Sequence, residues 1–190
     1  MLLLVGLGNP GSNYTNTRHN IGFKIIDAIN THFKLSKQKP KFKGLLTTGN
    51  IDQKKIYAIK PLTFMNNSGT AIKELIDYFK IDAKDVFVFH DDLDIDFGKI
   101  KTKFGGGSAG HNGIESIDKF IGKDYSRVRI GIGHPKTKKK VSKHVLEDFK
   151  DDEEEKINEI TANIVKQLPD LIEKKIDLFS SKVNQNLNGI

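Results

Sequence analysis

Hydrophobic residues follow two different patterns along this chain. Apolar runs within residues 2–7 (LLLVGL) and 85–92 (DVFVFHDD) are typical of strands that are buried on both faces of a sheet. Residues 20–33 and 68–80 instead place apolar side chains every three or four positions, which predicts amphipathic helices. This alternation of strands and helices indicates an α/β fold.

Four further segments have strand-like patterns: residues 44–51, 54–60, 97–104 and 127–133. Only Asp52 and Gln53 separate the first two, which predicts a hairpin of antiparallel strands. We therefore expect a single domain over residues 1–190, with a mixed, mostly parallel twisted sheet flanked by helices on both faces.

The C-terminal part of the chain predicts mainly helices. Residues 108–122 predict a helix that is entered from a glycine-rich loop. Residues 153–168 predict another, whose acidic first turn suits the positive end of the helix dipole. Pro169 is expected to end that helix and to be followed by one short helix, and residues 181–190 have the composition of a frayed tail.

Composition narrows the class of protein. The 190 residues include no cysteine, which excludes disulfides, thiolate nucleophiles and thiolate metal sites. No basic segment precedes a long apolar run at the N-terminus, and no apolar stretch approaches the roughly 18 residues of a membrane span. We therefore expect a cytoplasmic protein.

The net charge of +7 is distributed unevenly along the chain. Residues 141–190 hold 7 lysines against 11 acidic residues, whereas residues 1–140 hold 24 lysines and arginines against 13 acidic residues. A basic body suggests a polyanionic partner, nucleic acid first, because basic side chains set against phosphates release condensed counterions. Solubilising surface lysines would give the same composition, and charge alone does not separate the two interpretations.

Gly6, Gly8 and Gly11 have the G-x-G-x-x-G spacing of a dinucleotide-binding loop, directly after the first predicted strand. However, the polar stretch at residues 12–17 has poor helix propensity, and Pro10 removes an amide that a phosphate would need. The acidic residue expected about 20 positions beyond the glycines is also absent. These departures argue against a dinucleotide cofactor.

Polar residues gather where the predicted buried strands end, which is where open α/β sheets place their sites. TRHN, which contains His19, follows the first strand, and HDDLD forms the end of the second at residues 90–94. A histidine beside a carboxylate has the parts of a general base whose tautomer and charged form the acid supports. Taken alone, a histidine in this position is more often an ordinary residue of a surface loop, because a single sequence rarely shows which side chains pair in space.

Asn9, Asn66 and Asn112 occur in the same loops. A neutral amide can hold a carbonyl or a sugar hydroxyl and can stabilise an oxyanion, although asparagine is also common in turns and helix caps. Because the chain has neither a G-x-S-x-G serine nor a cysteine, water is the expected nucleophile. The acids of HDDLD lack a recognisable metal-ligand spacing, so no metal is expected.

Five motifs in order resemble those of the bacterial peptidyl-tRNA hydrolases: GLGNPG with TRHN, PLTFMNNSG, HDDLD, FGGGSAGHNG and RVRIGIGHP. The resemblance covers residues 2 to about 149, while the acidic helical tail matches only in length and character. It implies hydrolysis of the ester between the C-terminus of a peptide and the 3′-terminal ribose of tRNA, which recycles tRNA from prematurely released chains.

The resemblance also implies roles for individual residues. His19 would activate water as a general base, and Asp91, the first acid of HDDLD, would orient it. Asn9, Asn66 and Asn112 would bind the peptide main chain and the terminal adenosine. Asn9 and Asn112 would belong to the catalytic set, Asn112 as the candidate to position the water or the oxyanion.

Further implied positions surround that centre. Tyr14 and Phe64 would line the substrate channel, with His111 beside the site. Lys103 and Arg129 match basic positions that clamp a tRNA phosphate. The resemblance implies neither metal nor cofactor, no membrane and no obligate protein partner, and a monomer.

Two competing interpretations remain open at this point. A relative that kept the fold and lost hydrolysis would act as an RNA-binding protein, and a nucleotide-dependent or metal-dependent hydrolase would form a third class. The basic run at residues 136–140 (KTKKK) exceeds what the chemistry requires, so we expect Lys138, Lys139 and Lys140 to contact the body of the tRNA.

Overall fold

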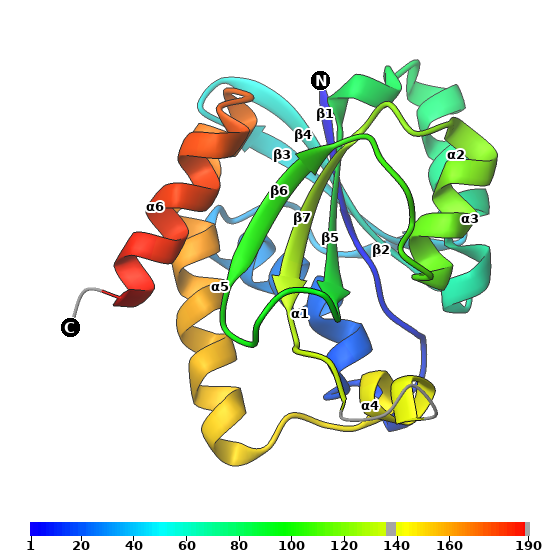
Figure 1. Ribbon diagram of the computed structural model, residues 1–190. Coiled ribbons are helices and arrows are strands. Elements are labelled where there is room, and N and C mark those ends of the chain that lie inside the picture. The colour runs from blue at the N-terminus through cyan, green and yellow to red at the C-terminus, as the bar shows by residue number, and fades with distance from the viewer. Residues whose placement is uncertain (136–139, 189–190) are drawn as a thin grey trace.

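The computed structural model describes residues 1–135 and 140–188 and has one seven-stranded twisted sheet between two layers of helices (Figure 1). The strands, in chain order, are β1 (Leu2–Gly6), β2 (Lys39–Lys41), β3 (Gly44–Ile51), β4 (Lys54–Pro61), β5 (Val86–Asp92), β6 (Ile100–Phe104) and β7 (Ser126–Gly131). Their spatial order is β2-β3-β4-β1-β5-β7-β6. The central strands β4, β1, β5 and β7 run parallel, whereas β2, β3 and β6 pair antiparallel at the two edges. The predicted fold class is therefore confirmed.

The helices are α1 (Ile21–His32), α2 (Ser68–Phe79), α3 (Asn112–Ile121), α4 (Val141–Leu146), α5 (Asp151–Ile172) and α6 (Ile176–Asn188). Figure 1 shows α2 and α3 on one face of the sheet and α1, α5 and α6 on the other. Each face has its own hydrophobic core. Within the described part of the chain, no helix has the length and apolarity needed to cross a membrane.

The central strand β1 separates the two cores. Leu2 and Leu4 belong to the core beneath α1 and α5, while Leu3 and Val5 belong to the core beneath α2 and α3. Successive strand residues point to opposite faces, so a strand covered on both sides must be apolar throughout. This explains the unbroken apolar run at the start of the sequence.

The glycines after β1 bring α1 close to the sheet. A Cβ added at Gly6 would lie 2.2 Å from the carbonyl oxygen of Gly22, so α1 can pack this closely only where both positions lack a side chain. Gly11 has a φ of 109°, which allows the loop to turn back toward α1. The glycines with the spacing of a dinucleotide fingerprint thus allow close packing and a turn. They place the start of α1 next to the end of the sheet.

The C-terminal helices differ from the prediction. Pro169 lies inside α5 and does not end it, because the apolar face continues through Leu171 and Ile172 into the core. Residues 181–188, expected to fray, complete α6 instead, and Val183 and Leu187 are buried one helical turn apart. Residues 189–190 lie outside the described residues.

The strands also differ from the prediction, since β7 ends at Gly131 rather than at residue 133. β6 begins at Ile100, three residues later than predicted, because residues 97–99 belong to the turn that precedes it. The short edge strand β2 was not predicted, since KPK has no alternating apolar pattern and contains a proline that only an edge strand accommodates.

Candidate active site

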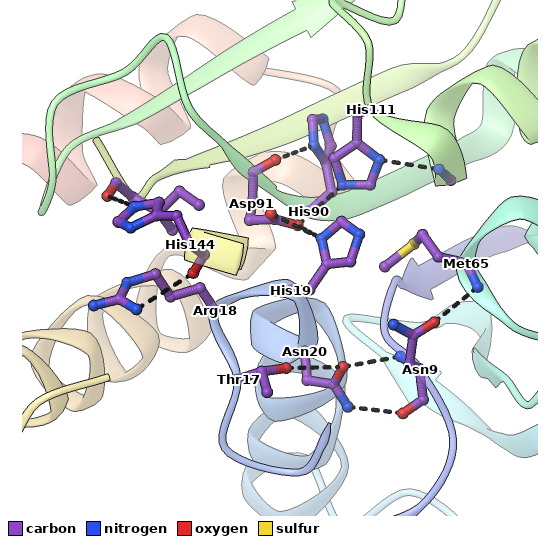
Figure 2. A network of polar contacts seen from close by, with 12 residues as sticks. Asn9, Thr17, Arg18, His19, Asn20, Met65, His90, Asp91, His111 and His144 are labelled. Atoms are coloured by element: carbon purple, nitrogen blue, oxygen red, sulfur yellow. Dashed lines mark hydrogen bonds and ion pairs between the residues drawn. The ribbon is translucent and has the colours of Figure 1, made fainter. Parts of the chain in front are cut away.

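The carboxyl ends of the neighbouring strands β1 and β5 meet at one edge of the sheet, and the predicted catalytic residues lie there. His19 lies in a short 3-10 helix, Arg18–Asn20, that leads directly into α1. Asp91 is near the end of β5, and His111 caps the N-terminus of α3. Figure 2 shows these side chains converging from three separate parts of the chain.

His19 and Asp91 form a buried pair. The Nδ1 atom of His19 lies 2.9 Å from both carboxylate oxygens of Asp91, and the two residues are 8% and 2% exposed. Because a carboxylate can only accept, Nδ1 carries the proton and donates it, which leaves Nε2 of the neutral ring with a free lone pair. The structure thus fixes the tautomer that a general base requires.

Asp91 also determines the direction in which the pKa of His19 is shifted. Burial lowers the pKa of His19, but the negative charge of Asp91 and the hydrogen bond to it outweigh this effect, so the pKa is raised above its ordinary value. Burial would raise the pKa of Asp91, but the charges of His19 and His111 and their hydrogen bonds hold it far below its usual range. Asp91 is therefore ionised at neutral pH.

His111 forms the other side of this arrangement. Its Nδ1 accepts from the backbone amides of Gly113 and Ile114, at 3.1 and 3.3 Å, and so caps α3. Since amides can only donate, the proton of neutral His111 is on Nε2, which lies 3.0 Å from Asp91 Oδ1. Asp91 therefore accepts hydrogen bonds from two imidazoles.

His90 lies beside this group, but its ring binds a main-chain carbonyl and not the carboxylate of Asp91. Its Nδ1 donates to the backbone carbonyl of Asp91 at 2.7 Å, and its ring packs against that of His111 with centroids 4.9 Å apart. Nε2 of His90 is buried and has no hydrogen-bond partner among the residues that the structure describes. Burial, together with the charge of His111, lowers the pKa of His90 to about 3, so this histidine is neutral at physiological pH.

His19, Asp91 and His111 form a group whose ligand-type atoms lie within 4.8 Å of one another, close enough to be considered for a metal. Their hydrogen bonds oppose that use. A metal would need a lone pair on Nε2 of His111, but that atom carries the proton as long as Nδ1 accepts the α3 amides. The donor set therefore fits a hydrogen-bonded triad better than a metal centre.

Asn9 is held beside this triad by contacts to its main chain and its side chain. Its Oδ1 accepts from the backbone amide of Met65 at 2.9 Å, so the amide orientation is fixed, and Figure 2 shows Nδ2 on the side that faces His19. The side chain of Asn20 brackets the main chain of Asn9, accepting from its N–H at 2.8 Å and donating to its C=O at 2.9 Å. The sequence motif TRHN contained Asn20, but no pattern in the sequence indicated its partner.

A pocket of about 430 Å³ opens in front of His19 and Asp91. Asn112, exposed at the start of α3, lines it together with His111 and the loop that precedes α3. Val141 and Val145 of α4 form its opposite wall. His19, Asp91, His111 and Asn112 are thus brought together in one pocket.

The remaining predicted substrate residues, Tyr14, Phe64 and Asn66, are not part of the lining of this pocket. Asn66 is exposed and lines an adjoining pocket that also contains Asn112. The rings of Tyr14 and Phe64 approach each other edge to face with centroids 6.5 Å apart, and Phe64 is 57% exposed.

The two residues predicted to bind phosphate differ in their surroundings. Lys103 is exposed on β6, and its side chain extends beside Gly106. Arg129 donates from Nε to Asp92 at 2.7 Å, which leaves its terminal nitrogens directed elsewhere. Of the basic run expected to contact tRNA, residues 136–139 lie outside the described residues.

No pattern in the sequence indicated the roles of the other two arginines. Arg127 is buried and donates to the carbonyls of Gly106 and Gly107 and to Asp118, so it fixes the glycine-rich loop that leads to α3. Arg18 binds Glu153 at 2.6 Å and the carbonyls of His144 and Glu147. With only three arginines among 31 basic residues, the rarity of arginine was the available signal, because its rigid fork suits buried carboxylates and carbonyls better than lysine does.

Arg18 attaches the C-terminal part of the chain to the site. It is 3% exposed and directly precedes His19, and the carbonyls that it binds lie at the end of α4 and just after it. Its guanidinium also lies 5.4 Å from the centre of the Phe149 ring. The wall that α4 contributes to the pocket is thus tied to the segment that carries His19.

Comparison with known proteins agrees with this geometry. A crystal structure of peptidyl-tRNA hydrolase from Acinetobacter baumannii superposes with a TM-score of 0.91 at 35% sequence identity, covering 97% of this chain and 94% of that one. A relative from Pelagibacter ubique (strain HTCC1062), named peptidyl-tRNA hydrolase, is 72% identical over 184 residues, which are 97% of this chain and 99% of the relative. Another of that name from Ehrlichia ruminantium (strain Welgevonden) is 48% identical over 95% of this chain and 93% of its own length.

The fold, the site and these similarities define an enzyme of the hydrolase class built on a single α/β domain. The family model for peptidyl-tRNA hydrolase matches residues 3–189. The chain belongs to the peptidyl-tRNA hydrolase family.

Proposed function

We propose that this enzyme hydrolyses the ester between the C-terminal carboxyl of a peptide and the 3′-terminal ribose of tRNA, with a water molecule activated by His19. The observation that carries the proposal is the buried pair in which Asp91 holds the proton of His19 on Nδ1 and leaves Nε2 free as the base. As the water attacks the ester carbonyl, His19 takes its proton, and the ionised Asp91 stabilises the imidazolium that forms. The imidazolium then gives this proton to the 3′ oxygen of the ribose as the bond between that oxygen and the acyl carbon breaks, which releases the peptide acid and tRNA and leaves His19 neutral. His111 keeps Asp91 in place from the other side.

The asparagines would supply neutral hydrogen bonds to the substrate. Because Oδ1 of Asn9 accepts from the amide of Met65, Nδ2 points to the side that faces His19, and from there it would donate to the substrate carbonyl. Asn112 would position the water or the oxyanion from the opposite side of the pocket, and Asn66 would bind the substrate main chain or the terminal adenosine. Tyr14 and Phe64 would line the channel.

Metal independence is part of the proposal. An ester has a good leaving group, so a histidine-activated water with neutral oxyanion donors suffices for its hydrolysis. The proton on Nε2 of His111 leaves that nitrogen without a lone pair for a metal, which supports the same conclusion. No cofactor is required by these steps.

Lys103 and Arg129 would bind a tRNA phosphate, since Lys103 is exposed and Arg129 uses only Nε for Asp92. A cytoplasmic enzyme that acts as a monomer without an obligate protein partner fits this reaction.

Release of an N-acetylated amino acid from tRNA in buffer containing EDTA tests the proposal. The wild type should turn over, and His19→Ala should lower kcat by about 10² or more. His32→Ala, at an exposed position near the end of α1, is the matched control and should keep wild-type activity. A wild type that binds tRNA but releases nothing would instead favour an RNA-binding protein, and activity restored only by added metal would contradict the metal-free mechanism.

A further inference from the structure

Arg127 lies directly beside one of the two residues proposed to bind a tRNA phosphate. It is paired with Lys103 across the antiparallel strands β6 and β7, so the two side chains are on the same face of the sheet. Arg129, two positions further along β7, is the diagonal neighbour of Lys103 on that face, and such neighbours lie roughly 7–8 Å apart. Lys103 and Arg129 can therefore reach one phosphate group, with Arg127 next to them.

Arg127 itself is not available to RNA. It is 3% exposed, and its terminal nitrogens donate to the carbonyls of Gly106 and Gly107, at 2.9 and 2.7 Å. Nη2 also donates to Asp118 Oδ1 at 2.8 Å, so the charge of the guanidinium is neutralised. A phosphate contact needs an accessible, unpaired cation, and Arg127 is neither accessible nor unpaired.

Two neighbouring side chains hold Arg127 in one orientation. Tyr125 is fully buried, and its ring centre lies 4.8 Å from the guanidinium. Its hydroxyl donates to the same Oδ1 atom of Asp118 at 2.8 Å. Burial raises the pKa of Tyr125, so the hydroxyl keeps the proton that it donates. Asp118 thus accepts from both side chains and fixes them relative to α3.

The glycine loop, residues 105–107, is the segment that Arg127 holds. Gly105 and Gly106 have φ angles of 67° and 95°, and a chain of glycines has no side chains with which to fix its own conformation. The amide of Gly105 donates to the carbonyl of Tyr125 at 3.0 Å, and Arg127 binds the carbonyls of the next two residues. All three glycines are therefore anchored to the strand β7 or its first neighbour.

The end of the Lys103 side chain lies against this loop. A Cβ added at Gly106 would be 2.6 Å from both Cε and Nζ of Lys103, so the lysine occupies the space that a side chain at residue 106 would fill. The carbonyl of the same glycine accepts from Arg127. A lysine has a long, flexible stem, and contact with a fixed surface reduces the conformational entropy that it loses when it binds a phosphate.

We propose that Arg127 is a positioning residue for tRNA binding: it fixes the glycine loop, and the glycine loop keeps the ammonium group of Lys103 in place for a phosphate. This inference rests on the proposed function, because the phosphate belongs to the tRNA of the substrate. Arg127 contributes to the affinity for tRNA without touching it, and Asp118 contributes through Arg127 although its own charge opposes RNA.

The sign of a charge effect tests this. Asp118→Ala and Asp124→Ala each remove one negative charge, and by electrostatics alone each would bind RNA as tightly as the wild type or more tightly. Asp124 is exposed in the turn before β7 and is the matched control. We expect Asp118→Ala to bind uncharged, labelled tRNA about threefold more weakly in fluorescence anisotropy, whereas Asp124→Ala does not weaken binding. On N-acetylated aminoacyl-tRNA, Asp118→Ala should raise KM by a similar factor and change kcat by less than about twofold.

A double-mutant cycle connects the effect to Lys103. Arg127→Lys keeps the charge but lacks the planar fork that binds two carbonyls and a carboxylate. It should weaken tRNA binding about fivefold, and Lys103→Ala should do so about tenfold. The double variant should bind no more weakly than Lys103→Ala alone, because both changes remove one contact. Both single variants should also reduce the salt dependence of binding by about one phosphate contact, although Arg127→Lys leaves the net charge unchanged.

The outcomes separate this inference from the proposed function. Unchanged or tighter binding by Asp118→Ala, or additive effects in the cycle, overturns the inference and leaves the hydrolysis standing. If Lys103→Ala binds tRNA like the wild type, the inference fails together with the proposed phosphate contact, and His19→Ala still decides the hydrolysis. A wild type that binds tRNA without cleaving the ester overturns the proposed function, while the binding data still decide the inference. Should Arg127→Lys fail to fold, the same cycle is made with Asp118→Ala.

Discussion

The side-chain amide of Asn20 pairs with both main-chain groups of Asn9, through bonds of 2.8 and 2.9 Å. Asn20 directly follows His19 in the chain, so one 3-10 helix carries both the proposed general base and the side chain that holds the main chain of Asn9. Both asparagines are buried, and Oδ1 of Asn20 also lies 3.5 Å from Oγ1 of Thr17. Their pairing joins the loop after β1 to the start of α1 next to the triad.

Replacing Asn20 should therefore impair catalysis through Asn9. Asn9→Ala removes the proposed donor to the substrate and should lower kcat by about 10². Asn20→Ala should also lower kcat, and the double variant should fall no further than the worse single variant, because both changes disrupt one unit. Asn16→Ala, an exposed asparagine in the preceding loop, serves as the control. Fully additive effects in steady-state kinetics would show that the two asparagines act separately.

The pH profile should report the His19–Asp91 pair. Since the neutral form of His19 is the base and its pKa is raised, kcat/KM should increase with pH through an apparent pKa above about 6.5. Asp91→Asn removes the charge that raises this pKa and leaves the effect of burial, so the rising limb should move to lower pH while the plateau falls. If the rising limb of the Asp91→Asn profile stays at the same pH as that of the wild type, the group that titrates is not His19.

His90 should make the protein less stable in acid. The unfolded chain binds a proton on this histidine below pH about 6.5, but the folded protein does so only near pH 3, so the free energy of unfolding decreases as pH falls through this window. At pH 5 this effect of His90 lowers the free energy of unfolding by an amount on the order of 2 kcal/mol. Urea denaturation should show a flatter pH dependence for His90→Asn than for the wild type. His32→Asn is the comparison for loss of an exposed histidine, and equal slopes in all three proteins would contradict this account.

The contact between Arg18 and Glu153 should contribute to stability. Glu153→Ala removes the nearer of the two carboxylates that pair with the buried guanidinium, leaving only Glu147 at 3.9 Å, and also removes the acceptor of the backbone N–H of Lys150. We expect a loss of about 2 kcal/mol in the free energy of unfolding. Glu155→Ala, at an exposed position on the same helix turn, should change it by less than about 0.5 kcal/mol. Similar values for the two variants would mean that the ion pair contributes nothing measurable.

The central strands and most helices could be predicted because their burial imposes a pattern. β1 and β5 lie between two cores, and their unbroken apolar runs reflect this directly. The prediction failed where local propensity and tertiary packing disagree, as at Pro169, which α5 accommodates because the side chains after it are buried. The short strand β2 forms by pairing with β3, and its own three residues have no pattern that predicts a strand.

The site was predictable to the extent that chain topology dictates it. Polar residues after β1 and at the end of β5 had to meet, since these strands are parallel neighbours, and His19 and Asp91 do so. The partner of Asn20 and the tautomer of His111 could not be predicted, because both depend on which backbone groups face a given side chain. The glutamates at the start of α5 suited a helix N-terminus, but their binding to Arg18 and Lys24 required the fold.

The attachment of Arg18 to the chain beyond α4 also affects when the site can form during synthesis. Its partners lie 126 to 135 positions later in the sequence, at His144, Glu147 and Glu153. A ribosome makes the segment with His19 early, yet that segment acquires these contacts only after residue 153 has left the exit tunnel. A growing copy of this enzyme, itself a peptide attached to tRNA, thus remains without its completed site until most of its own length has been made.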